Sequence, residues 1–234
     1  AMGLICLGIA IAVQPWRARL DADRRSDHPL WPESLFAPLG TMFRGPRLRA
    51  LGITGLVYAG MQYAFGAVMV AFFVDRAGLA PVEAALVLSA AMVASVVARI
   101  GWGYAANWLR PDVVLGMLGV LTAASVVVAI FVTPQWSRLA LIALGCWFGI
   151  AGFSWNGVYL ALVADIAGPD RVAAATSGVM TMIFLGSLAF PAVFAALVAA
   201  SGYDAALLFV ATVTAVTAVY VYLRLSPSMG GVSR

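Results

Sequence analysis

The feature that most constrains this chain is a series of six apolar stretches, each long enough to cross a bilayer. A membrane-spanning helix needs about 20 consecutive apolar residues. The stretches are residues 50–74, 83–106, 112–133, 138–164, 172–200 and 205–224. Hydrophobic residues make up 63% of the chain and charged residues only 10%, against about a quarter charged in soluble domains. A soluble enzyme, a disordered chain and a nucleic-acid-binding module are therefore excluded, and the expected surrounding is a lipid bilayer.

The separators between these stretches are short and contain turn residues and charges. They are residues 75–81, 107–112, 134–138, 168–171 and 201–204. Every backbone polar group in a bilayer must be satisfied within the protein, which favours helices over open strands. The sequence therefore predicts an all-α polytopic membrane protein, with a six-helix transmembrane bundle over residues 50–224.

The flanking segments have different compositions. Residues 1–13 are apolar but too short to span, so we expect the end of a truncated transmembrane helix there. Residues 14–49 contain seven of the 14 arginines and are predicted to form a basic cytoplasmic loop. Residues 225–234 are predicted to be a cytoplasmic tail.

The basic residues predict the orientation in the membrane. All 14 are arginine, and if residues 14–49 are cytoplasmic, only Arg76 and Arg138 lie on the opposite side. Cytoplasmic loops carry an excess of Lys and Arg. We therefore expect a multi-pass protein of a cytoplasmic membrane with its C-terminus inside.

Two local sequence motifs resemble motifs of a known protein family. Residues 99–110 read Arg-Ile-Gly-Trp-Gly-Tyr-Ala-Ala-Asn-Trp-Leu-Arg, and residues 152–165 read Gly-Phe-Ser-Trp-Asn-Gly-Val-Tyr-Leu-Ala-Leu-Val-Ala-Asp. The first resembles the loop motif Gly-x-x-x-Asp-Arg in the C-terminal half of the major facilitator superfamily. The second is similar to the tenth helix of its bacterial members. At Asn107 the chain departs from the family, which has Asp there.

The resemblance implies an architecture, a mechanism and partners. It implies helices seven to twelve of a twelve-helix transporter in a bacterial inner membrane, with 3+3 inverted repeats. The missing N-terminal six-helix half, in the same chain or as a second subunit, would complete the central cavity. A small solute would then cross by alternating access, in secondary active or facilitative transport.

Aromatic and amide side chains near the middles of two helices are candidates for solute contact. The resemblance places the first and fourth helices of the bundle along the central cavity. Amides in hydrocarbon need partners, so they either line a water-filled cavity or bond neighbouring helices. The candidates are Tyr58, Gln62, Tyr63, Phe65, Trp155, Asn156 and Tyr159.

A second candidate group lies at the predicted cytoplasmic face and forms the gate and loop motif. Its members are Arg99, Gly103, Asn107, Arg110, Asp165 and Arg171. We expect an ion pair of Asp165 with Arg99 or Arg110 that breaks when the inner gate opens. The alternative is that these residues anchor helix ends among the lipid headgroups.

The remaining residues argue against catalysis. His28 lies in the polar loop, and Cys6 and Cys146 are too far apart in sequence to indicate a disulfide framework or metal site. No glycine-rich phosphate loop with Lys is present. We expect no metal, no cofactor and no enzymatic activity. The alternatives to transport are a scaffold or assembly factor on the same fold and, least favoured, an intramembrane enzyme.

Overall fold

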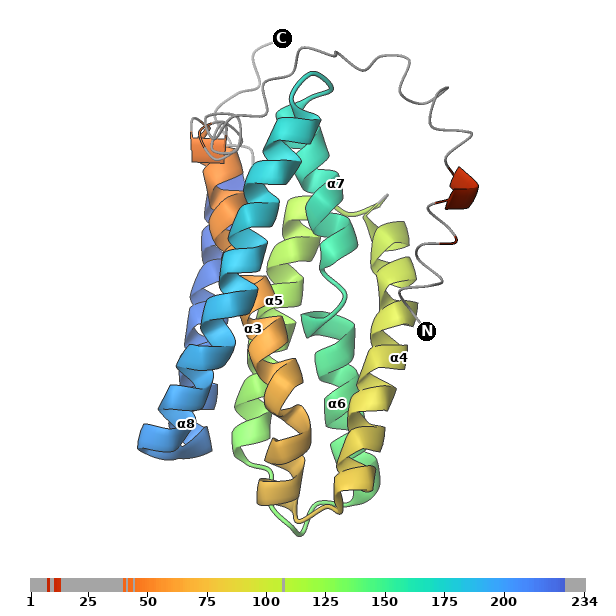
Figure 1. The fold of residues 1–234 in the computed structure, drawn as a ribbon, viewed down its shortest axis with the longest axis vertical. Coiled ribbons are helices and arrows are strands. Elements are labelled where there is room, and N and C mark those ends of the chain that lie inside the picture. The colour runs from red at the N-terminus through yellow and green to blue at the C-terminus, as the bar shows by residue number, and fades with distance from the viewer. Residues whose placement is uncertain are drawn as a thin grey trace. The chain divides into compact units, whose positions relative to one another are not determined.

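The computed structural model describes residues 8, 11–13, 40, 42–43, 45–106 and 108–225. From residue 45 onward these form a helical bundle, and the described residues contain no β-strand (Figure 1). The helices are α3 (Pro46–Ala77), α4 (Pro81–Ala105), α5 (Pro111–Ile130), α6 (Arg138–Gly152), α7 (Asn156–Ala167) and α8 (Val172–Leu225). The predicted residues 14–39, Asn107 and the tail residues 226–234 lie outside the described residues, as does most of 1–13.

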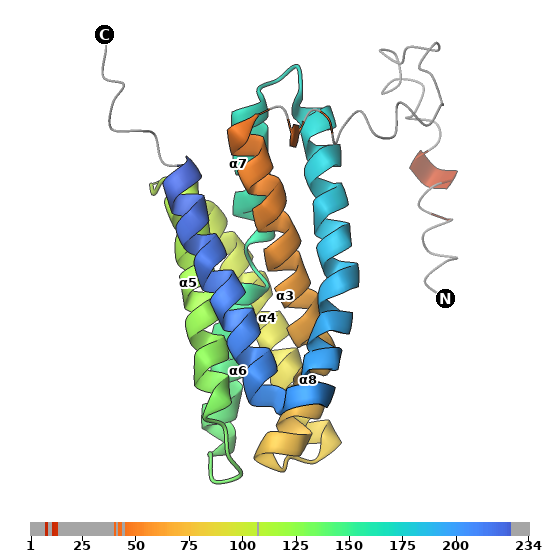
Figure 2. The same cartoon turned by 90° about the vertical axis from the view of Figure 1, so that its left-hand side faces the viewer.

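The described helices have the length and composition of a multi-pass membrane protein. Five helical stretches are long and apolar enough to cross a membrane, with α6 and α7 together forming one of them. The longest, α8, is interrupted at Gly202, where φ is 79° and ψ is 176°. The chain reverses at this glycine, and the two arms of α8 are visible in blue in Figure 2. The predicted all-helical fold and the turn at residues 201–204 are thus confirmed.

Proline and glycine set most of the helix ends. Pro46, Pro81 and Pro111 each occupy the first turn of their helix, where the fixed φ suits a helix and the missing N–H costs nothing. Gly78 ends α3 with φ of 68°, a left-handed conformation that favours glycine. The described loops therefore lie close to the predicted separators.

Glycines allow two pairs of helices to approach until backbone meets backbone. A Cβ added at Gly186 of α8 would overlap the carbonyl oxygen of Leu56 in α3. Likewise, a Cβ at Gly149 of α6 would overlap the carbonyl oxygen of Ala91 in α4. Small residues at membrane helix interfaces permit this close packing. The first arm of α8 is thereby held against α3, and α6 against α4.

Two buried tyrosines connect helices through main-chain carbonyls. The Tyr58 hydroxyl donates to Leu115 O at 3.2 Å, and the Tyr159 hydroxyl donates to Leu51 O at 2.9 Å. Each accepting residue is followed four positions later by glycine, Gly119 and Gly55 respectively. A side chain at that position would cover the carbonyl, so glycine leaves it accessible to a second donor.

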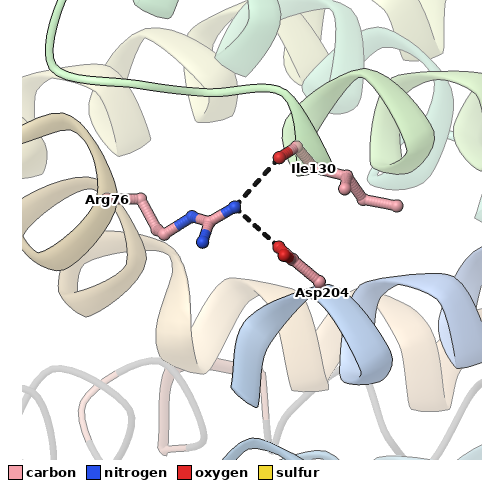
Figure 3. Close-up of polar contacts among 3 residues, drawn as sticks. All are labelled: Arg76, Ile130 and Asp204. Atoms are coloured by element: carbon pink, nitrogen blue, oxygen red, sulfur yellow. Dashed lines mark hydrogen bonds and ion pairs between the residues drawn. The ribbon is translucent and has the colours of Figure 1, made fainter. Parts of the chain in front are cut away.

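At the end of the bundle where α3 turns into α4, a cluster of polar side chains connects neighbouring helices. Arg76 Nη2 donates to Ile130 O at 3.0 Å and to Asp204 Oδ1 at 2.6 Å (Figure 3). The Tyr203 hydroxyl, at the turn in α8, donates to Asp75 Oδ2 at 2.9 Å. Burial and the Asp75 carboxylate raise the pKa of Tyr203 to about 12, so Tyr203 stays a donor at neutral pH. The cluster ties the ends of α3 and α5 to the turn in α8.

Candidate functional site

The fourth predicted span is not one continuous helix. The sequence predicts a single helix over residues 138–164, but α6 ends at Gly152 and α7 begins at Asn156. The connection is visible as the irregular segment between the two labels in Figure 1. At 1.5 Å per residue, the 15 residues of α6 rise about 22 Å before the interruption. The interruption therefore falls inside a hydrocarbon layer of about 30 Å if the span starts at Arg138.

Side chains of α4 donate hydrogen bonds to two backbone carbonyls at this interruption, those of Ile150 and Phe153. Arg99 donates to Phe153 O from Nε at 3.3 Å and from Nη2 at 3.0 Å. Trp102 Nε1 donates to Ile150 O at 2.9 Å, and the Ser154 hydroxyl donates to the same oxygen. Non-helical backbone at membrane depth occurs only where protein buries it or where it lines a water-filled cavity. The interruption is thus stabilised by specific side-chain hydrogen bonds.

Gln62 of α3 also contacts the interruption, through Trp155. Trp155 Nε1 donates to Gln62 Oε1 at 2.9 Å, and the Trp155 ring is fully buried. The Trp155 ring makes edge-to-face contacts with Tyr58 at 5.7 Å and Tyr159 at 5.1 Å between centroids. Four of the predicted solute-contact residues are therefore clustered: Gln62, Trp155, Tyr58 and Tyr159.

The burial of these side chains divides the predicted group. Tyr58, Phe65, Trp155 and Tyr159 are buried in the bundle, where their hydroxyl, indole and ring contacts join neighbouring helices. The Phe65 ring lies 4.2 Å from the Phe148 ring of α6, centroid to centroid. Gln62 and Asn156 are half-buried. Tyr63 is 54% exposed and does not join the cluster.

The gate group is not gathered at one place. Arg99 lies within α4 and reaches the interruption, whereas Arg110 precedes α5 and pairs with Asp112 at 2.6 Å. Asp165 is exposed near the end of α7, and no ion pair among the described residues includes it. Gly103 is open, since an added Cβ would meet nothing within 4 Å. The predicted latch is therefore not formed within the described part of the chain.

Arg171 belongs to a cavity at the end of the bundle where α3 begins. The cavity has a volume of about 610 Å³ and is lined by the start of α3, the end of α7 and the α7–α8 turn. Its charged lining residues are Arg47, Asp170 and Arg171. A second, open hollow of about 550 Å³ lies along α4 and is apolar apart from the Trp102 indole. Neither cavity includes Gln62, Arg99 or Asn156 among its lining residues.

The pairing of Gln62 with Trp155 predicts a measurable loss of stability. Gln62→Leu keeps the side-chain size but leaves the Trp155 N–H without its acceptor, which we expect to cost about 1–3 kcal/mol of unfolding free energy. Adding Trp155→Phe removes the donor, so the double variant should lose less than the sum of the two single losses. Unfolding of the purified chain in mixed detergent micelles measures all three. Gln135→Leu, in an exposed turn, is the matched control, and strictly additive losses would contradict the pairing.

No protein-family model matches the chain, and a search of curated proteins finds no match.

Proposed function

We propose that this chain forms one half of a solute transporter of the major facilitator type. A second six-helix unit, in the same chain or as a separate subunit, completes a central pathway through a bacterial cytoplasmic membrane. A small solute crosses by alternating access as the two halves rock about a site near the middle of the membrane. The transport is secondary active or facilitative.

The observation that carries this proposal is the interrupted helix at membrane depth. Transporters commonly bind their solutes where a membrane helix is discontinuous, because freed backbone groups and nearby polar side chains are available there. Here α3 supplies Gln62, α4 supplies Arg99, and α7 begins with Asn156. A packed scaffold needs no such interruption, since a continuous helix satisfies its own backbone.

The helix contacts are compatible with a rocking half. The glycine contacts of α3 with α8 and of α4 with α6 make each pair a closely packed unit. Closely packed helices move together. Any relative movement during transport therefore takes place at helix faces that are not closely packed. The exposed faces of α4 and of the first arm of α8 are apolar, which suits lipid or a second helical unit.

Water access to the interruption tests the proposal. Gly157, the second residue of α7, is exposed, and a Cβ there meets nothing within 4 Å, so Gly157→Cys introduces a thiol without a clash. With Cys6 and Cys146 replaced by alanine, we expect this thiol in membrane vesicles to react with small, charged, membrane-impermeant methanethiosulfonates. Inside-out and right-side-out vesicles should both react, because alternating access opens the site to each side in turn.

A second cysteine variant serves as a control that distinguishes exposure to water from exposure to lipid. Leu188 of α8 is 77% exposed in the bundle, and we expect Leu188→Cys to face lipid and remain unlabelled. No reaction at residue 157 from either side would exclude a water pathway and favour a non-transporting scaffold. Equal labelling at residues 157 and 188 would show that access is not specific to the interruption.

A further inference from the structure

We propose that the interruption between α6 and α7 is an anion-recognition site, and that the solute is a small organic acid whose single carboxylate is held by Arg99. The proposal rests on the proposed transport function and names the chemical class of its solute.

Arg99 places a positive charge where charge is costly. Its guanidinium meets Phe153, which follows the 15 residues of α6. A charged group at such depth faces a water-filled cavity or pairs with another group. No carboxylate pairs with Arg99 among the described residues, and its partner there is the neutral carbonyl of Phe153. The positive charge is thus held in place but not neutralised by these residues.

The hydrogen bonds of Arg99 leave part of the guanidinium available. A guanidinium carries five N–H donors in a rigid plane. Nε and one N–H of Nη2 are directed to Phe153 O, which fixes that plane, and the Arg99 side chain is otherwise exposed. The N–H groups of Nη1 and the second of Nη2 remain. Such an edge matches the two oxygens of a carboxylate.

The side chains of Gln62 and Asn156 near the interruption are amides, which can donate hydrogen bonds and carry no negative charge. Gln62 uses its carbonyl oxygen to accept from Trp155, so the free end of its amide is the NH₂ group. Asn156 follows Trp155 directly and is half-buried. Phe153 and Asn156 are three residues apart, which limits their separation to about 11 Å. Arg99 of α4 and Gln62 of α3 therefore both contact residues 153–155, and these side chains bring a cation and an amide NH₂ group to one short segment, which favours an acceptor-rich anion.

The number of charges limits the anion. Every other arginine of the described helices lies in a first or last turn: Arg47, Arg49, Arg76, Arg138 and Arg224. Arg99 is thus the one positive charge in the middle part of these helices. A single carboxylate balances it, whereas a doubly charged phosphate ester would leave excess negative charge in a poorly solvating environment.

The test uses the thiol of Gly157→Cys as a reporter of local charge. We measure the rates at which this thiol reacts with anionic sulfonatoethyl methanethiosulfonate and with cationic trimethylammonioethyl methanethiosulfonate. The rates are compared between the Gly157→Cys protein and three variants of it. Arg99→Gln should lower the ratio of anionic to cationic rates about tenfold, because one nearby positive charge is removed. Arg99→Lys retains the charge and should keep most of the preference. Arg224→Gln removes the same charge at the end of α8 and should leave the ratio unchanged.

A second readout measures protection of the thiol by a small carboxylate, first with Arg99 intact. Acetate in large excess should slow the reaction of the residue-157 thiol with the anionic reagent, and acetamide, its neutral counterpart, should not. Arg99→Gln should abolish the protection by acetate.

The outcomes separate the two proposals. A thiol that reacts with both reagents at a ratio unaffected by Arg99→Gln overturns the anion site but leaves the water pathway standing. Equal protection by acetamide also overturns it. A thiol that reacts with neither reagent overturns the transport proposal itself.

Discussion

Gly186→Ala is expected to destabilise the bundle by about 3 kcal/mol, although alanine is the better helix former. The added methyl would overlap the Leu56 carbonyl oxygen, which belongs to the backbone of α3 and cannot rotate away. The helices must therefore separate, and the contact of Phe190 with Gly60 on the same interface would loosen with them. Thermal unfolding in detergent, followed by circular dichroism, measures the loss.

The control for this variant is Gly101→Ala in α4. A Cβ at Gly101 meets nothing within 4 Å, so only the helix propensity changes and stability should stay the same or rise by up to about 1 kcal/mol. If Gly186→Ala behaves like Gly101→Ala, α3 and α8 do not pack backbone to backbone.

Gly55→Ala is expected to cost about 2 kcal/mol, and a second substitution should recover part of that loss. A Cβ at Gly55 would lie 2.5 Å from the Tyr159 hydroxyl oxygen and 3.0 Å from Ile183 Cγ1. Tyr159→Phe alone should cost about 1 kcal/mol, because it removes the hydrogen bond to Leu51 O. In the double variant the methyl occupies the space of the missing hydroxyl, so the combined loss should fall short of the sum by about 1 kcal/mol.

This pair also tests the role of Tyr159. If the hydroxyl serves the structure, the double variant should retain the water access of residue 157 described above. Tyr104→Phe, at an exposed tyrosine of α4, is the control and should change stability little. Additive losses would mean that the Tyr159 hydroxyl does not lie over Gly55.

The helix positions follow from simple physical signals in the sequence. The predicted stretch 50–74 lies within Pro46–Ala77, and the turn expected at residues 201–204 contains Gly202. Uninterrupted apolar composition marks a span, and proline and glycine mark its ends. Both are local properties, so they can be read without knowledge of tertiary contacts.

The faces of the helices could not be predicted in the same way. Tyr58, Gln62 and Phe65 share a face by spacing, and it was the family resemblance that placed their helix along a central cavity. In the structure Tyr58 bonds to α5, Gln62 bonds to Trp155, and Phe65 packs on Phe148. A helix that is apolar all round carries little periodicity to mark its buried side.

The interrupted helix was missed because average hydropathy does not detect it. Residues 138–164 are apolar throughout, so they read as one span. The available signal is the run of residues from Gly152 to Gly157, which includes Ser154 and Asn156 and has low helix propensity. Arg99 was assigned to a loop motif by sequence, and only the three-dimensional contact with Phe153 connects it to this run.

The interruption has a consequence for the order in which the protein is made. Neither α6, with 15 residues, nor α7, with 12, is long enough to cross the hydrocarbon alone, so the two must enter the membrane as one unit. Chains are synthesised from the N-terminus, and α4 precedes α6. Arg99 and Trp102 are therefore synthesised before Ile150 and Phe153, so the donors that these carbonyls need already exist when the irregular segment emerges from the ribosome.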